Sequence, residues 1–305
     1  MQPGDLSLKS TAVPGSRDLP EGAEHAEPVT LRTIREMVAR GENFASLTCY
    51  DATTARWLQR AGVHILLVGD TAAEMILGYS RTIDMPLDVL LALTAGVKRG
   101  GPRCLVMGDM PFMSYQADDA EAIRNAGRFM TDGMADLVKI EADESYAPLI
   151  GLMARAGIPV CAHVGSKPQQ VGLAGGYAAA GRTAEEAERI VRDAAALEQA
   201  GAVMLLIEAV PEEVTARILA ATKVPVIGIG AGTACHGQVL VLQDLLGLTD
   251  VPPRFAEPVV ALGPVVQGAA AEWVARVRSG RIGGRRYSMS KGEAEKLRNR
   301  TPPKA

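Results

Sequence analysis

Aromatic side chains and long apolar runs are scarce in this sequence. Phe, Trp and Tyr make up only 4% of the 305 residues, although 48% of the residues are hydrophobic. No apolar run reaches the roughly 18–20 residues that a helix needs to cross a bilayer, which argues against a membrane protein. The N-terminal residues contain several acids and no apolar core segment, so we expect no secretory signal.

Cysteine is also sparse, and its spacing predicts neither a disulfide framework nor a zinc site. The four cysteines are Cys49, Cys104, Cys161 and Cys235; none forms a CxxC pair, and the first three lie in apolar runs. Free cysteine is among the most buried residue types, so we expect buried core positions in a reducing compartment. The cytoplasm is therefore the expected location.

A large excess of charge of one sign is absent, because the formal net charge is −3. This argues against nucleic acid or an anionic membrane surface as a partner. Positive charge gathers at the C-terminal end, where ten Lys or Arg and two acids follow from Arg276 onward. We interpret residues 281–305 as a basic, flexible tail, with contact to a neighbouring subunit or another acidic partner as the alternative. Residues 1–28, rich in Pro, Gly and charge, are predicted to be a disordered leader.

The sequence does contain a repeated alternation of short apolar runs and helical stretches. Seven runs predict strands, FASLTCYD, HILLVGD, CLVMGDM, LVKIE, PVCAHVG, VMLLIEAV and PVIGIGAG. Most are continuous apolar runs, as expected for strands with both faces buried. An eighth strand is predicted only weakly, near Arg254–Ala256. The stretches GQVLVLQDLLGL and LGPVVQGAAAEWVARVRSG are predicted to be helices, the second closing the ring.

Alternating strands and helices predict an α/β fold with a parallel sheet. Seven or eight units at this length favour a single (β/α)₈ TIM barrel over residues 29–280, which usually needs about 250 residues. An open doubly wound sheet is the alternative. The helix LRTIREMVARG, capped by Thr30, could close the bottom of such a barrel. Active sites of this fold lie at the C-terminal ends of the strands.

Polar side chains recur at those predicted strand ends. They are Asp51, Asp70, Asp109, Lys139, Glu141, His163 and Glu208. One such acid is often only a loop cap or a surface ion pair, but several together in one barrel mouth indicate an active site. Crowded carboxylates repel one another unless a cation is present. Mg²⁺ prefers hard oxygen ligands, so we predict Asp70 and Asp109 as direct ligands and Glu141 as a direct or water-linked one.

A 2-oxo acid is the substrate class that this set of residues suggests. Mg²⁺ can chelate the ketone and carboxylate oxygens of such an acid and stabilise its enolate. Glu208 is the candidate base for the proton next to the carbonyl, and Lys139 would neutralise the substrate carboxylate or oxyanion. His163 could donate a hydrogen bond there, although a structural role is equally open.

Two further motifs carry weaker signals. The glycines of GIGAG, Gly228–Gly232, would suit a phosphate-binding loop, but close backbone packing at a turn explains them as well. Cys235 and His236 are adjacent metal-binding residue types without evident partners, which is weak evidence for a metal site.

Longer segments around these residues resemble the ketopantoate hydroxymethyltransferase family. They include LTCYDATTA, LLVGDT, MGDMPFMSY, GMADLVKIE, IPVCAHVGSKPQ, GGYAAAGR and VPVIGIGAG, in unbroken order from about Phe44 to Asp250. The resemblance implies a barrel of the phosphoenolpyruvate/pyruvate type. It also implies Mg²⁺-dependent, aldol-type transfer of a hydroxymethyl group from 5,10-methylenetetrahydrofolate to 3-methyl-2-oxobutanoate, giving 2-dehydropantoate. A homo-oligomer, commonly a decamer, is implied too.

The resemblance also implies roles for individual residues. Asp70 and Asp109 match metal ligands, and Glu141 matches a third, water-linked metal carboxylate. The residues that match substrate-contacting positions are Asp70, Thr71, Asp109, Lys139 and His163, and Glu208 matches the proton acceptor.

The sequence departs from the family pattern at TAAE after Asp70 and in GGYAAAGR, where the family is more polar. Neither departure removes a predicted catalytic residue. Two alternatives are a related barrel that makes or breaks C–C or P–C bonds, and a catalytically inactive binding barrel. The first usually carries a KKCGH-like run that this sequence lacks, and the second does not explain why every predicted catalytic residue is retained.

Overall fold

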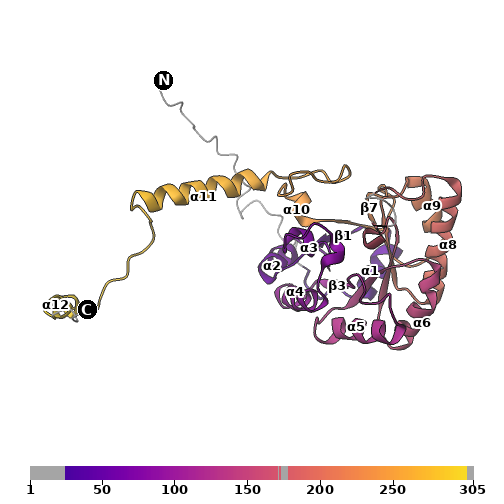
Figure 1. Cartoon of the computed structure of the whole chain (residues 1–305), viewed down its shortest axis with the longest axis horizontal. Coiled ribbons are helices and arrows are strands. Elements are labelled where there is room, and N and C mark those ends of the chain that lie inside the picture. Colours follow the sequence, from indigo (N-terminus) through magenta and orange to yellow (C-terminus); the bar gives the residue numbers. More distant parts are fainter. Residues whose placement is uncertain (1–24, 171, 173–177, 301–305) are drawn as a thin grey trace, which may run out of the picture.

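Eight parallel strands form a closed barrel in the order of the sequence, β1 to β8 (Figure 1). The computed structural model describes residues 25–170, 172 and 178–300. The strands are β1 (Phe44–Thr48), β2 (Ile65–Val68), β3 (Leu105–Asp109), β4 (Leu137–Glu141), β5 (Val160–Gly165), β6 (Met204–Glu208), β7 (Val226–Ile229) and β8 (Gly237–Leu240). β8 pairs with both β7 and β1, so the sheet has no open edge and the alternative of an open sheet is wrong.

Helices connect the strands and cover the outside of the barrel. They are α2 (Ala52–Arg60), α3 (Ala72–Met75), α4 (Leu87–Gly100), α5 (Asp119–Thr131), α6 (Ala147–Arg155), α8 (Ala184–Ala200), α9 (Glu212–Ala221) and α10 (Leu242–Leu245), with short 3₁₀ turns η1 (Thr82–Asp84), η2 (Glu144–Tyr146) and η3 (Pro168–Gln170). In the described part of the chain, no helix has the length and apolar character needed to cross a membrane.

The apolar core has two layers, as a barrel fold requires. One cluster lies between the strands and the outer helices, and it includes the fully buried Phe129 of α5. The other fills the barrel interior and includes Met107 of β3 and Cys161 of β5. Ile34 and Met37 of α1 (Leu31–Ala39) belong to the interior cluster, so this helix packs on the barrel as predicted. All four cysteines are buried and free.

The prediction for the eighth strand is wrong. Residues 254–256 lie in an irregular segment, whereas the strand is Gly237–Leu240, inside a stretch predicted to be a helix. Short apolar runs fit both periodicities, and here pairing with β1 decides the outcome. A side chain at Gly237 would overlap the ring of Phe44, so glycine allows this close pairing.

The predicted closing helix does not close the barrel. Helix α11 (Leu262–Arg278) has no buried residue and projects away from the barrel (Figure 1). The eighth strand is therefore followed on the barrel by the one-turn helix α10 instead of a long helix. Within the predicted tail, the described residues up to 300 are exposed and contain the short helix α12 (Glu293–Arg298); residues 1–24 of the predicted leader and 301–305 of the tail lie outside the described residues.

We expect Gly100→Ala to destabilise the barrel, because α4 and α2 meet at this glycine. A methyl group at Gly100 would overlap the backbone of Ala52. Alanine normally stabilises a helix interior by up to about 1 kcal/mol relative to glycine, but overpacking against backbone costs about 1–3 kcal/mol. Gly96→Ala on the same helix is the control, since nothing lies within 4 Å of that position. Urea unfolding of both variants measures the difference, and equal stability would contradict this contact.

Candidate active site

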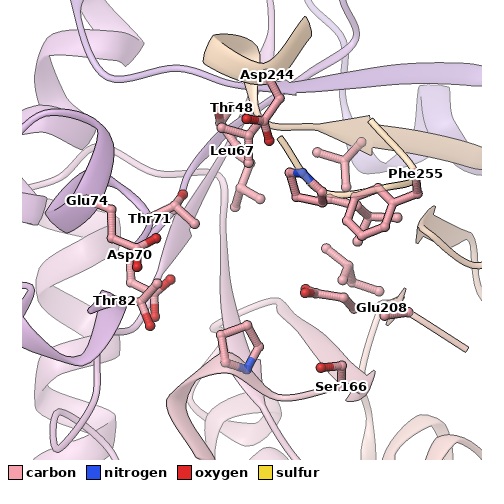
Figure 2. A pocket seen from close by; sticks show the side chains of 18 of the residues that line it. Thr48, Leu67, Asp70, Thr71, Glu74, Thr82, Ser166, Glu208, Asp244 and Phe255 are labelled. Atoms are coloured by element: carbon pink, nitrogen blue, oxygen red, sulfur yellow. The ribbon is translucent and has the colours of Figure 1, made fainter. Parts of the chain in front are cut away.

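The C-terminal ends of the strands surround a cavity of about 730 Å³. The predicted site residues Asp70, Thr71, Asp109, Lys139, Glu141, His163 and Glu208 all line it. Figure 2 shows Asp70 and Thr71 on one side of the cavity and Glu208 on another. The parallel strands bring these residues together from distant parts of the sequence. A cavity of this size is typical of small-molecule sites.

Lys139 is the cationic centre of the site. It comes from β4, is 5% exposed, and its Nζ lies 2.7 Å from Asp109 Oδ1. The same Nζ is 3.4 Å from Nδ1 of His163 on β5. Burial opposes the charge of Lys139, but the neighbouring carboxylates, Asp109 foremost, raise its pKa, so it stays protonated.

The site holds more carboxyl groups than the single cation Lys139 can neutralise. Burial is the main cause that raises the pKa of Asp109 to about 7, with the Asp70 charge adding to it. Burial also raises the pKa of Glu141 well above its ordinary value, and that of Glu208 to about 7. A cation placed among these groups would favour their ionised forms.

His163 is electrically neutral in this setting. Burial, and then the charges of Lys139 and Lys167, lower its pKa well below the ordinary value. Its Nε2 lies 3.4 Å from Glu208 Oε2 and has no hydrogen-bond partner. His163 therefore presents an uncharged ring between Lys139 and the candidate base.

Thr71 is held in place by Tyr50. The Oγ1 of Thr71 and the Tyr50 hydroxyl are 2.6 Å apart, and Tyr50 is buried. Glu74, from the TAAE departure, also lines the cavity. This departure from the family pattern therefore lies at the site.

Gln169 is a site residue that the sequence analysis missed. It lies in η3 and is 5% exposed. Its Nε2 donates to Asp70 Oδ2 at 3.0 Å, and its backbone N–H donates to Glu141 at 3.0 and 3.1 Å. The Tyr115 hydroxyl donates to its Oε1 at 3.0 Å. Gln169 thus hydrogen-bonds to two of the predicted metal-binding carboxylates. Its position in a short turn gave no sign of this role in the sequence.

We expect Gln169→Leu to weaken both metal binding and activity, because it removes the amide that orients Asp70. Partners of this kind typically contribute about 10–100-fold to metal affinity or activity. Gln170→Leu is the control, because the neighbouring side chain makes none of these hydrogen bonds. Mg²⁺ titration by calorimetry on both folded variants is the measurement; equal affinities would mean that Gln169 has no role in the site.

The donor set fits a Mg²⁺ ion. Asp70 and Asp109 are both buried, and the backbone N–H of Asp70 donates to Asp109 Oδ2 at 3.1 Å. Among the described residues, no three His, Cys, Asp or Glu side chains are already grouped as a metal cage. Mg²⁺ does not need one, because it commonly uses one or two carboxylates and completes its shell with water and substrate oxygens. The carboxylates of this site, which outnumber its cations, would supply the protein oxygen ligands.

Helix capping, close packing and a backbone hydrogen bond account for three other predicted features. Asp51 is the N-cap of α2, where its side chain accepts from the backbone N–H groups of Thr53 and Thr54, so it is a helix cap rather than a site residue. A side chain at Gly230 would overlap Phe255, so close packing accounts for this glycine of GIGAG. His236 Nδ1 accepts from the Val226 N–H, which gives this ring a structural partner.

Comparison with known proteins agrees with this geometry. The model of the ketopantoate hydroxymethyltransferase family matches residues 28–284. The 3-methyl-2-oxobutanoate hydroxymethyltransferase of Hyperthermus butylicus is 45% identical over 273 residues, covering 89% of this chain and 94% of the relative. The enzyme of the same name from Halorhodospira halophila is 43% identical over 256 residues, covering 84% and 93%.

Solved structures share the barrel at much lower identity. A 2,3-dimethylmalate lyase of the PEP mutase/isocitrate lyase superfamily has a TM-score of 0.55 at 17% identity, covering 88% of this chain and 96% of that one. Phosphoenolpyruvate phosphomutase from Streptomyces platensis subsp. rosaceus has a TM-score of 0.57 at 14% identity, covering 83% and 89%. These likenesses show the fold, whereas the family match and the curated relatives cover nearly the whole chain. The chain belongs to the ketopantoate hydroxymethyltransferase family.

Proposed function

We propose that this protein transfers a hydroxymethyl group from 5,10-methylenetetrahydrofolate to 3-methyl-2-oxobutanoate, giving 2-dehydropantoate in a Mg²⁺-dependent reaction. The observation that carries the proposal is that the buried Asp70, Asp109 and Lys139 and the partly buried Glu208 all line one cavity. The names of the relatives supply the keto acid and the group transferred.

Asp70 and Asp109 would hold the Mg²⁺, with Glu141 linked to it directly or through water. A Mg²⁺ ion at this place would act as a Lewis acid towards the oxygens of the keto acid. Lys139 places a fixed positive charge beside Asp109, where it stabilises negative charge that develops on the substrate. Neutral His163 contributes its free Nε2 as a hydrogen-bond donor.

Glu208 is suited to accept the C3 proton of the keto acid. Its carboxyl has a pKa of about 7, raised mainly by burial. A base works best when its pKa lies near the operating pH, because it is then both partly ionised and strongly basic. Water would supply the hydroxyl oxygen, because cleavage of both C–N bonds of the folate methylene by one water molecule releases tetrahydrofolate and leaves the carbon at the formaldehyde level. The carbanion equivalent would attack this carbon, and the resulting alkoxide would take up a proton to give the hydroxymethyl group.

We also propose that the chain forms a homo-oligomer in the cytoplasm. Helix α11 supports the first part, because Val266 and Trp273 are each more than half exposed and nothing in the described part of the chain buries any residue of this helix. Large exposed apolar surface commonly marks a protein interface. Buried free cysteines support a reducing compartment.

The first test is an NMR assay of the purified protein with 3-methyl-2-oxobutanoate, 5,10-methylenetetrahydrofolate and Mg²⁺, with and without EDTA. We expect 2-dehydropantoate only when metal is present. Exchange of the C3 proton without product would mean that the enolising half is correct and the one-carbon donor is wrong. Absence of both from folded, metal-loaded protein would refute the proposal.

A further inference from the structure

The cavity extends beyond the group of residues assigned to the keto acid and the metal. One further carboxylate, that of Asp244 on α10, lines it. Figure 2 shows this side chain entering the cavity beside Thr48 and Leu67, whereas Glu208 enters from another side. Asp244 is 3% exposed, and its Oδ1 has no hydrogen-bond partner. No step of the proposed reaction uses it.

The fold holds Asp244 firmly in this position. The backbone N–H of Leu242, at the start of α10, donates to Thr48 Oγ1 of β1 at 3.0 Å. The helix then ends at once, because Gly247 follows with a φ of +62°. Any side chain at Gly247 would overlap the carbonyl oxygen of Val260. The backbone that carries Asp244 is therefore fixed to the barrel.

A second unsatisfied polar atom lies in the same wall. Thr249 lines the cavity, and its Oγ1 is buried without a hydrogen-bond partner. Buried polar atoms in native proteins almost always have partners, because an unpaired one costs about 1–3 kcal/mol. Asp244 and Thr249 both belong to the wall of this one cavity, which points to a ligand that supplies polar partners there.

The surroundings restrict what this ligand can be. The chain segment that follows Thr249 also lines the cavity and offers apolar side chains to a flat ring, namely Val251, Pro252 and Phe255. Arg254 lines the cavity and is exposed, so its cation can meet an anionic tail of the ligand. A carboxylate such as Asp244 would repel the anionic keto acid, and it favours a ligand with paired N–H donors.

We infer that Asp244 and Thr249 form the subsite for the 2-amino-4-oxopyrimidine edge of the pteridine of the one-carbon donor. This inference rests on the proposed function. The ring N–H and the exocyclic amino group form two parallel donors that match a carboxylate, as a guanidinium does. The Thr249 hydroxyl is placed to hydrogen-bond a neighbouring polar atom of the ring. Arg254 then receives the carboxylates of the glutamyl tail.

The test uses tetrahydrofolate as the probe and calorimetry as the readout. Asp244→Asn is expected to bind it about ten- to a hundredfold more weakly than the wild type, since a hydrogen bond to a charged group is lost. Asp250→Asn is the control, because it makes the same change at an exposed aspartate in the segment that follows α10. A tetrahydrofolate analogue without the 2-amino group should bind the wild type weakly. Its affinities for the wild type and for Asp244→Asn should be equal.

Each result bears on the inference. Equal tetrahydrofolate affinity of Asp244→Asn and the wild type overturns the subsite and leaves the proposed function intact. Failure of the wild type to bind tetrahydrofolate overturns both. If Asp244→Asn does not fold, the wild type alone decides: equal affinity for tetrahydrofolate and its 2-desamino analogue refutes the subsite, and a clear preference for tetrahydrofolate supports it.

Discussion

Replacing Glu208 by Gln is expected to abolish proton exchange at C3 of 3-methyl-2-oxobutanoate. The substitution keeps the size of the side chain but removes the group that accepts the proton. Loss of a positioned base typically lowers the rate by about 10²–10⁴-fold. The measurement is exchange of the C3 proton into D₂O by NMR, with Mg²⁺ present and no folate, so that only the enolising half of the reaction is observed.

This experiment separates a base from a residue that only binds. Glu208 is not among the proposed metal ligands, so Mg²⁺ and keto-acid affinities of Glu208→Gln should stay close to those of the wild type. Glu213→Gln serves as the control, because Glu213 is exposed on α9, the helix that follows β6. Normal exchange in Glu208→Gln would remove Glu208 as the base.

The position of the charged residues was predictable because the fold imposes it. Parallel strands in a barrel end at one face, so a carboxylate at the end of a continuous apolar run had to lie at that face. Asp109, Glu141 and Glu208 are all the last residues of their strands. Asp51 shows the limit of this reasoning, because a residue directly before a helix can cap it instead.

Other parts of the site were not predictable from periodicity. Gln169 lies in a 3₁₀ turn, and Asp244 lies in a one-turn helix that the sequence suggested to be much longer. Their importance comes from hydrogen bonds, or from the lack of them, in three dimensions. The local sequence around each carries no signal of that kind.

The predictions for the eighth strand and for the closing helix failed for different physical reasons. Gly237–Leu240 is short enough to fit either secondary structure, and pairing with β1 selected the strand. The stretch that forms α11 is helical as predicted, but the helix does not pack against the barrel. Amphipathic sequence predicts that a helix has an apolar face and leaves open which surface covers it.

Replacing Asp109 by Asn is expected to weaken Mg²⁺ binding by at least about a hundredfold, more than the 10–100-fold typical of residues that only orient a ligand. Asn has the same shape, but it lacks the charge that attracts a hard cation and that pairs with Lys139. Calorimetric titration with Mg²⁺ measures the effect, at a temperature where thermal unfolding shows the variant to be folded.

Asp51→Asn provides the matched control for this titration. Asp51 also follows an apolar strand, so the sequence alone does not distinguish it from Asp109, but it caps α2. Asn is as good an N-cap as Asp, so the variant should fold and bind Mg²⁺ like the wild type. A loss of affinity in Asp109→Asn but not in Asp51→Asn would assign the metal to the cavity. Equal affinity in Asp109→Asn and the wild type would exclude Asp109 as a ligand, and the carboxylates of the site would then need another source of positive charge.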